Sequence, residues 1–256
     1  MTNKVAKNIA YKSPQISEYY SNNRQRWDDF YKSEKWVFER IAGENKSMGK
    51  ILDVGCACGG LGKALGEKYF FDSYTGIDIH SESITFAKRN INFERPVTLI
   101  NDDILNIDVK SEYDIVISLS CADWNIETEK IVTACWRGVK ENGYFVISLR
   151  LTNLEGVNDI HKSYQYINFF NDDAKPERAN YVVFNIWDAF KLLKNLIPQP
   201  LLIGAYGYWG KPSETARTSY NDLVFAVFYL KKGAKVRNED IEAELRLPIS
   251  LFFNCE

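Results

Sequence analysis

The stretch ILDVGCACGG, from Ile51 to Gly60, decides the expected fold. A run of branched apolar residues, suited to a buried strand, reaches an acid at Asp53 and then breaks into glycine, alanine and cysteine. A helix is expected to begin near Leu61. Glycine permits backbone conformations that a side chain forbids, and the start of a helix presents unpaired N–H groups. The turn is therefore a candidate cradle for a nucleoside-containing ligand.

Two common nucleotide-binding motifs do not match this turn. The dinucleotide fingerprint requires G-x-G-x-x-G, whereas the spacing from Gly55 is G-x-A-x-G-G. The phosphate-binding Walker pattern requires Gly-Lys-Ser/Thr, which does not follow here. An acid precedes the turn and another follows it. This pattern favours a nucleoside site that differs from the dinucleotide and Walker sites.

The residues DVGCACGG resemble the first motif of the class I S-adenosylmethionine-dependent methyltransferases, D/E-x-G-x-G-x-G. Ala57 replaces the family's middle glycine, which is the smallest departure, and it is expected to be tolerated if Ala57 keeps a negative φ. The resemblance implies S-adenosylmethionine as the cofactor. It implies a place in the cofactor site for Asp53, Gly55, Cys56 and Gly59.

A second acid follows at the expected distance along the chain. The segment from Ser73 to Ile79 is predicted to be the second strand, and Asp78 lies at its end. Taken alone, Asp78 would be a surface aspartate at the end of a strand. The resemblance implies that its carboxylate accepts hydrogen bonds from both ribose hydroxyls, with Ile79 beside it.

A third strand, 97–100, runs into a further polar turn. In the family an acid at this point meets the adenine amino group, and the next backbone N–H meets a ring nitrogen. Asp103 with Ile104 matches that pattern best, and Asp102 is the rival shifted by one residue. A plain polar turn is the alternative without a ligand.

The later segments complete an α/β pattern. Residues 113–120 are predicted to be the fourth strand, and Ser118 near its outer end is assigned to the cofactor site because ligands bind beyond the carboxyl ends of parallel strands. A turn at 141–143 leads to a fifth strand, 144–151, and residues 201–210 and 222–232 are two further strands. Ser81 and Asn125 are expected to cap the helices that follow the second and fourth strands. We expect a Rossmann-like, seven-stranded, mostly parallel sheet with a terminal antiparallel hairpin strand and an N-terminal helical lid.

The whole chain, 1–256, is expected to form one methyltransferase-like domain. Its predicted parts are a helical lid (1–43), a cofactor-binding half (50–150), a substrate-side insertion (151–180), a closing unit of a helix and strands (181–231) and a tail (232–256). The insertion is inferred because periodicity fails there, and a long loop in a compact domain is usually functional or carries short elements of its own.

Residues 16–42 have apolar side chains at helical spacing and are predicted to form one helix or two joined helices. The simplest interpretation is an amphipathic helix that covers the sheet. The resemblance implies in addition a lid over cofactor and substrate, lined by Tyr19, Tyr20, Arg24, Trp27 and Tyr31. Of these, Trp27 is assigned to the cofactor site.

Composition and charge limit the classes of binding partner that are expected. The net charge of −2 argues against a broad phosphate-binding surface, so nucleic acid is not expected. No apolar run is long enough to cross a membrane, the N-terminus lacks a secretory signal, and the five cysteines resemble reduced thiols, so a cytoplasmic protein is predicted. No metal site is expected. A small-molecule substrate is expected, and a homodimer stays open.

The cofactor named by the resemblance is already an activated methyl donor, so the protein chiefly needs to align the acceptor with the carbon–sulfur bond. A general base becomes useful when the acceptor is an alcohol. The candidates are His161, in the predicted insertion, and Asp123, just past the fourth strand. The alternative for His161 is an ordinary polar loop residue. The alternative for Asp123 is a ligand of a divalent metal ion.

We therefore predict methyl transfer to a small molecule, most simply to a hydroxyl group of a sugar or natural product. The Asn/Asp-Pro-Pro-Tyr motif of certain amino-group methylases is absent after the fourth strand, where LSCADWN stands. Methylation of an amine or a macromolecule stays an alternative. A cofactor-binding subunit without chemistry of its own, and a scaffold that merely keeps the fold, are the others.

Overall fold

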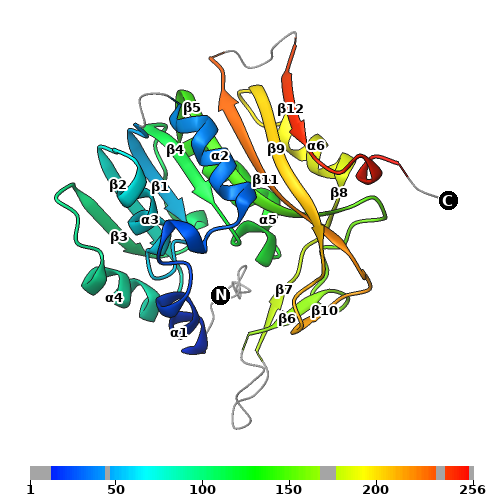
Figure 1. Ribbon diagram of the computed structural model, residues 1–256, viewed down its shortest axis with the longest axis horizontal. Helices are drawn as coiled ribbons and strands as arrows, with labels where there is room; N and C mark the ends of the chain where they lie inside the picture. Colours follow the sequence, from blue (N-terminus) through cyan, green and yellow to red (C-terminus); the bar gives the residue numbers. More distant parts are fainter. Residues whose placement is uncertain (1–12, 44–46, 168–176, 235–239, 254–256) are drawn as a thin grey trace, which may run out of the picture.

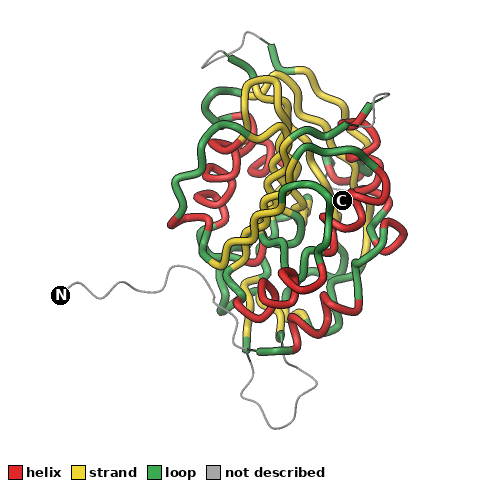
Figure 2. Tube along the Cα trace, turned by 90° about the vertical axis from the view of Figure 1, so that its left-hand side faces the viewer, coloured by secondary structure: helices red, strands yellow, loops and turns green. Residues whose placement is uncertain are grey.

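The computed structural model describes residues 13–43, 47–167, 177–234 and 240–253. A twisted sheet lies at its centre with helices on both faces (Figures 1 and 2). Within the described residues the sheet has nine strands, β1 (Lys50–Val54), β2 (Ser73–Asp78), β3 (Val97–Asn101), β4 (Tyr113–Ser118), β5 (Val139–Thr152), β8 (Phe184–Asn185), β9 (Pro200–Gly210), β11 (Leu223–Lys232) and β12 (Glu242–Arg246).

The strand order confirms the expected fold class. The order is β12-β9-β11-β5-β4-β1-β2-β3, and β8 pairs with β5 off this path. The pairs from β3 through β5 are parallel, whereas β11 runs antiparallel to both β5 and β9. Seven strands match the predicted ones. The additional strands β8 and β12 each extend the sheet in parallel, along β5 and β9 respectively.

Parallel pairing brings the polar ends of three strands together. Asp53 of β1 lies in register with Gly76 of β2 and with Ile117 of β4, and Asp78 lies in register with Asn101 of β3. Because the carboxyl ends of parallel strands meet at one edge of a sheet, the turns after β1, β2, β3 and β4 form a single rim. The candidate site is built on this rim.

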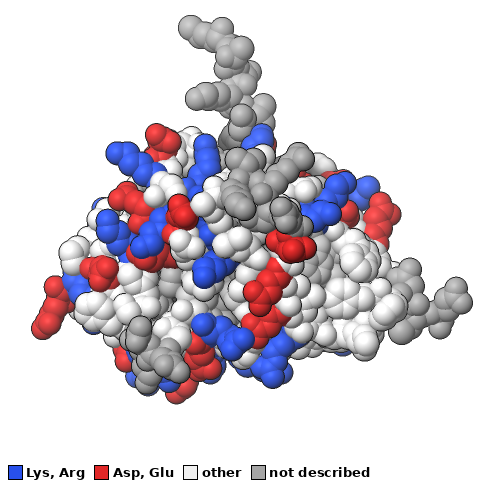
Figure 3. All heavy atoms as spheres, turned by 90° about the horizontal axis from the view of Figure 1, so that it is seen from above, with Lys and Arg blue, Asp and Glu red and all other residues white. Residues whose placement is uncertain are grey.

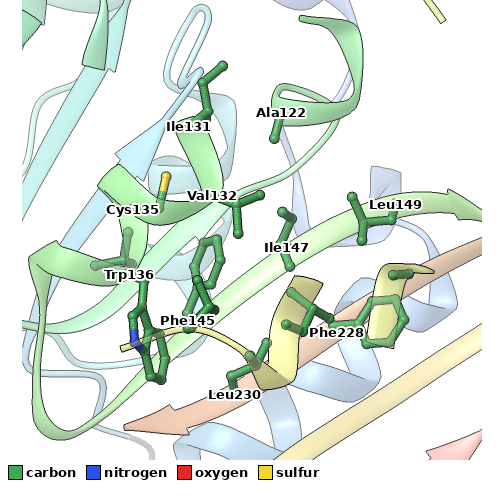
Figure 4. Close-up of a cluster of buried hydrophobic side chains, with 14 of the residues drawn as sticks. Ala122, Ile131, Val132, Cys135, Trp136, Phe145, Ile147, Leu149, Phe228 and Leu230 are labelled. Carbon is green, nitrogen blue, oxygen red and sulfur yellow. The ribbon is translucent and has the colours of Figure 1, made fainter. Parts of the chain in front are cut away.

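Two apolar layers hold the sheet between helices. On one face, α2 (Lys32–Ala42) and α3 (Gly60–Lys68) bury Val37, Phe38 and Leu65 against the strands. On the other face lie α5 (Thr128–Gly138) and α6 (Ile186–Lys194). Figure 4 shows Val132 and Trp136 of α5 beside Phe145 and Ile147 of β5. Burying such side chains contributes about 1.5–3 kcal/mol each, so these layers fix the rim in place.

The predicted lid consists of α1 (Gln15–Asn22), the 3-10 turn η1 (Trp27–Asp29) and α2. Helix α1 packs beside α4 (Ser81–Asn90), and the carbonyl of Ser17 lies 3.4 Å from the thiol sulfur of Cys58 in the glycine-rich turn. The segment predicted as one helix or two is therefore two helices, separated by residues 23–31, which contain the turn η1. The first twelve residues of the predicted lid lie outside the described residues.

The predicted insertion contributes short strands of its own. Strands β6 (Tyr164–Tyr166) and β7 (Arg178–Asn180) pair antiparallel, and β10 (Ala216–Arg217) pairs antiparallel with β6, which gives a small three-stranded sheet. It lies below the lower end of β9 in Figure 1. Residues 168–176 of the insertion lie outside the described residues.

The tail also packs on the body. Strand β12 pairs with β9, and the turn η4 (Ile249–Leu251) buries Leu251 completely in the core. The apolar end of the predicted tail therefore docks on this chain. Residues 235–239 and 254–256 of the tail lie outside the described residues.

Three local expectations differ from the structure. His80, rather than Ser81, caps α4, because its Nδ1 accepts a hydrogen bond from the Ser83 N–H. Helix α5 starts at Thr128, since the Asn125 side chain donates instead to the Cys121 carbonyl. Strand β5 runs through the predicted turn at 141–143, where Asn142 has a positive φ of 63°.

Candidate functional site

A single cleft of about 1010 Å³ lies over the rim formed by the ends of β1, β2, β3 and β4. Its volume is at the upper end of the range for small-molecule sites, about 300–1,000 Å³. The cleft has two halves. The turn after β1 and the ends of β2 and β3 line one half, whereas the end of β5, the turn η3 (Ala122–Trp124) and the small sheet line the other.

The glycine-rich turn forms the floor of the first half. Gly55 has a φ of 79°, and a Cβ at this position would lie 2.5 Å from the sulfur of Cys121, so only glycine fits. The N–H groups of Gly55 and Cys56 donate to the carbonyl of Ile77, at 2.8 and 3.1 Å. These bonds tie the turn after β1 to the end of β2.

Ala57 corrects the expectation about the motif. It was expected to keep a negative φ, but its φ is 46°, in the left-handed region. The physical reason is a hydrogen bond from the Ala57 N–H to Asp78 Oδ2, at 2.8 Å, which holds the turn in this conformation. The glycine that the family motif has at this position would adopt the same conformation without strain. The alanine is accommodated at a cost in backbone energy.

Asp78 is held rigidly by the main chain. Its Oδ1 accepts a hydrogen bond from the His80 N–H at 2.8 Å, and its Oδ2 accepts the one from Ala57. Burial raises the pKa of this carboxyl, and these two hydrogen bonds lower it. Each carboxylate oxygen keeps a further lone pair, so the group can still accept hydrogen bonds from a ligand in the cleft.

Asp53 is fully enclosed at the end of β1. Its Oδ2 accepts a hydrogen bond from the Tyr74 hydroxyl at 2.6 Å. Burial raises the pKa of Asp53 to about 7, although the Tyr74 hydrogen bond and the charge of Arg24 both lower it. The group is therefore poised to gain or lose a proton near neutral pH.

The turn after β3 brings three predicted residues into the cleft: Asp102, Asp103 and Ile104 all line it. The side chain of Asp103 accepts a hydrogen bond from the Leu105 N–H at 2.9 Å and so caps the turn η2 (Ile104–Asn106). Asp102 accepts hydrogen bonds from Asp103 N–H and from Asn106. The choice between Asp103 and Asp102 as the adenine-side acid stays a prediction.

The remaining predicted cofactor residues divide into two groups. Ile79 lines the cleft, as do Asp53, Gly55 and Cys56. Three predicted residues are not among the lining residues, namely Gly59, which caps α3, Ser118, which is fully buried, and Trp27, whose ring packs edge-on against that of Tyr69 at 5.4 Å.

The lid supplies the opposite wall of this half. Of the five residues proposed for it, Tyr19, Tyr20, Arg24 and Tyr31 line the cleft, and Trp27 does not. Burial raises the pKa of Tyr20 to about 12, so this hydroxyl stays protonated at neutral pH.

The second half of the cleft holds Asp123. This carboxyl is buried, and its Oδ2 lies 3.3 Å from Nη1 of Arg150. Arg150 also donates to the carbonyls of Asp123 and Val182, and its guanidinium carbon lies 3.7 Å from the centre of the Tyr181 ring. Burial raises the pKa of Asp123, and the Arg150 charge lowers it. Asp123 Oδ1 has no hydrogen-bond partner among the described residues.

The structure does not bring His161 into the cleft. Its side chain is exposed, and its backbone N–H donates to Asp159 Oδ1. The two predicted bases are thereby separated, because Asp123 lines the cleft and His161 does not. Within the described ranges, no cluster of three or more His, Cys, Asp or Glu side chains could hold a metal ion.

Arg150 is the main site residue that sequence reasoning missed. It stands in the apolar run YFVISLRL of β5, where a buried charge requires a partner. That charged residue in an apolar strand was the available signal. The aromatic residues Tyr166, Tyr181 and Tyr208 come from segments far apart in the chain, and no local pattern connects them.

Comparisons with known proteins agree with this geometry. Residues 52–147 match the model of a methyltransferase domain. A putative methyltransferase of Bacillus subtilis, YqeM, is 26% identical over 160 residues, which are 61% of this chain and 58% of that protein. A malonyl-[acyl-carrier protein] O-methyltransferase of Acetivibrio thermocellus is 28% identical over 137 residues, 52% of this chain and 48% of the relative. The chain thus spans about half the length of the curated relatives it matches.

A solved structure shares the fold and contains the cofactor. Phosphoethanolamine N-methyltransferase 2 of Haemonchus contortus, in complex with S-adenosylmethionine, superposes with a TM-score of 0.52 at 14% identity, over 77% of this chain and 56% of that one. Residues 52–147 therefore contain a methyltransferase domain, in agreement with the resemblance of the glycine-rich turn. The chain shares its fold with this S-adenosylmethionine-bound methyltransferase.

The residues on the rim fit that cofactor. The glycine-rich turn lines the cleft, the Asp78 carboxylate keeps free lone pairs, and an acid lies in the turn after β3. None of the helices in the described ranges has the length and apolar character needed to cross a membrane.

Proposed function

We propose that this protein transfers a methyl group from S-adenosylmethionine to a hydroxyl group of a small molecule, with Asp123 as the general base. One observation carries the proposal. Asp123 is buried in the cleft that also contains Asp78, and its Oδ1 has no hydrogen-bond partner among the described residues. A buried carboxylate oxygen without a partner is costly unless a ligand satisfies it.

The chemistry of the pair Asp123–Arg150 suits this role. An alcohol must lose its proton as the methyl group arrives, and a base is most effective when its pKa lies near the working pH. Burial raises the pKa of Asp123 above its ordinary value, which makes the carboxylate a stronger base. Arg150 contacts Oδ2 and leaves Oδ1 to accept the hydrogen bond of a substrate hydroxyl.

Asp123 is preferred over His161 because only Asp123 lines the cleft. The oxygen acceptor is supported by the three relatives named malonyl-[acyl-carrier protein] O-methyltransferase, whose name specifies an oxygen. A small acceptor is supported by the cleft volume of about 1010 Å³. The face seen from above in Figure 3 mixes acidic and basic side chains and has no extended basic field. Such a mixture is a weak platform for nucleic acid.

The test is an acceptor screen with matched hydroxyl and amine compounds, in which formation of S-adenosylhomocysteine is measured. We expect turnover with hydroxyl compounds, and Asp123→Asn should lower it about 10²- to 10⁴-fold, the usual contribution of a general base. Its affinity for S-adenosylhomocysteine should stay within about twofold, because Asn keeps the shape of the side chain. His161→Asn is the matched control and should keep full turnover.

The other outcomes contradict the proposal in different ways. Turnover with amines alone, or with macromolecules alone, would assign a different acceptor. Binding of S-adenosylhomocysteine without turnover on any acceptor would favour a cofactor-binding subunit without chemistry of its own. Full turnover of the Asp123→Asn protein with a hydroxyl compound would remove Asp123 as the base.

A further inference from the structure

Arg24 lies where the lid crosses the glycine-rich turn. The residue joins α1 to η1 in a left-handed conformation, with a φ of 58°. Its carbonyl oxygen sits directly over Gly60, where an added Cβ would overlap it. The lid backbone therefore rests on the first residue of α3, and the Arg24 side chain lines the cleft beside the turn.

The guanidinium of Arg24 is held firmly and mostly buried, with 15% of the side chain exposed. Its Nη2 donates to Glu34 Oε1 at 2.8 Å, and its central carbon lies 4.4 Å from the ring centre of Phe30 and 5.4 Å from that of Tyr31. Glu34 is itself fixed, because its Oε2 accepts a hydrogen bond from the Tyr31 N–H at 2.8 Å. The cation is thus oriented before any ligand arrives.

The Arg24 guanidinium has N–H donors that no group in the described residues accepts. A guanidinium carries five N–H donors, and the hydrogen bond to Glu34 uses one. Within the part of the chain that the structure describes, Nε and Nη1 of Arg24 have no hydrogen-bond partner. A buried cation with free donors in a cleft is suited to an anionic group of a ligand.

The order of groups along the cleft indicates which anionic group that is. Asp103 lies at the predicted adenine end and Asp78 at the predicted ribose position, and Arg24 lies on the side of Asp53, whose pKa its charge lowers. The end of S-adenosylmethionine that is remote from adenine carries an α-carboxylate. A planar guanidinium matches a carboxylate with two parallel hydrogen bonds.

We propose that Arg24 binds the α-carboxylate at the methionine end of the cofactor. This inference rests on the proposed cofactor site and adds a binding residue from the lid. Through Arg24 the bound cofactor also contacts the lid directly, because the same guanidinium is tied to Glu34 of α2. Cofactor binding then fixes the wall of the cleft that faces the turn.

The experiment is a thermodynamic cycle measured by titration calorimetry. The ligands are S-adenosylhomocysteine and its decarboxylated analogue S-adenosyl-3-thiopropylamine, which differ only in the carboxylate. The proteins are the wild type and Arg24→Met, with Arg26→Met as the matched control, since Arg26 is an exposed arginine of the same segment. Circular dichroism checks that each variant is folded.

The wild type should bind S-adenosylhomocysteine about 10- to 100-fold more tightly than the analogue, the range for hydrogen bonds to a charged group. Arg24→Met should remove this preference by weakening S-adenosylhomocysteine alone, and Arg24→Lys should restore part of it. Arg26→Met should leave it unchanged.

Equal weakening of both ligands by Arg24→Met would show that Arg24 only supports the lid, and it would overturn the inference. A wild-type protein that binds both ligands equally would also overturn it, even if the variants fail to fold. Failure of the wild type to bind either ligand would contradict the proposed function itself, so the two failures are distinguishable.

Discussion

At the scale of single residues, the turn after β1 stores strain at Ala57. A non-glycine residue in the left-handed region costs roughly 1–2 kcal/mol, and Ala57 has a φ of 46° there. The hydrogen bond from its N–H to Asp78 compensates for part of this cost and couples the turn to the predicted ribose acid. The alanine that replaces the motif glycine therefore lowers the stability of the folded protein.

Ala57→Gly should stabilise the protein by about 0.5–1 kcal/mol, because glycine adopts this conformation without strain but has greater freedom when unfolded. Thermal or urea unfolding measures the change. The matched control is Ala64→Gly, in the interior of α3, where the same chemical change should destabilise by about 1 kcal/mol. A loss of stability in Ala57→Gly would contradict the account of this turn.

Asp53 makes folding stability depend on pH. Its pKa is raised from its ordinary value to about 7 in the folded protein, because the carboxyl is buried. The folded state therefore holds this proton more tightly than the unfolded chain. Its contribution is fully present at low pH and is lost as the pH rises through about 7.

Asp53→Asn should remove this dependence. Between pH 5 and pH 8 the free energy of unfolding of the wild type should fall by roughly 2–3 kcal/mol more than that of the variant. Urea unfolding of both proteins at the two pH values measures the difference. Equal pH dependence in the two proteins would show that Asp53 does not retain its proton in the folded state.

At the scale of elements, Lys232 ties β11 to the end of α5. Its amino group donates to the carbonyls of Trp136, Arg137 and Val139, and the Trp136 contact is 3.0 Å. Trp136 and Arg137 belong to the last turn of α5, and Val139 follows it. The Trp136 carbonyl also accepts the Val139 N–H, and the Val139 carbonyl also accepts the Ser111 hydroxyl, so the cation adds a charged donor to this end of the helix. The cation also lies at the negative end of the helix dipole.

Lys232→Met should cost about 1–3 kcal/mol of stability, since these carbonyls lose their charged donor. Chemical denaturation provides the measurement. Lys231→Met changes the neighbouring lysine, which is only partly buried, and should have little effect. Equal small effects of the two substitutions would mean that water replaces the Lys232 amino group.

The sequence predicted the elements that have strong local patterns. The strands that carry the rim acids were anticipated because short apolar runs end in a polar turn, as at Asp53 and Asp78. The small sheet was not anticipated, since β10 meets β6 some fifty residues away in the chain and each strand is very short. Strand β12 was missed because its residues EAELR are mostly charged.

The candidate site divides in the same way. The half proposed for the cofactor follows the order of strands, so local motifs predicted Gly55, Asp78 and Asp103, and all three line the cleft. The acceptor half depends on tertiary contacts, such as that between Asp123 of η3 and Arg150 of β5. That dependence is why His161 was considered beside Asp123, although its side chain lies on the surface.

At the scale of the whole molecule, one cleft contains both the proposed cofactor site and the proposed acceptor site. The rim of parallel strands and the lid form the half proposed for the cofactor, and η3, β5 and the small sheet form the half proposed for the acceptor. Both halves belong to one folded body, and the apolar layers on the two faces of the sheet fix their relative positions. In the proposed reaction this arrangement brings the acceptor to the donor in a fixed orientation, which is the main catalytic requirement.

The most direct test is titration calorimetry of S-adenosylhomocysteine with the wild-type protein and with Asp78→Ala. We expect saturable binding at one site in the wild type. Asp78→Ala should weaken it by about 1–3 kcal/mol, through loss of hydrogen bonds to a charged carboxylate. The absence of binding in the wild type, or equal affinity in the two proteins, would contradict the assignment of this cleft to the cofactor.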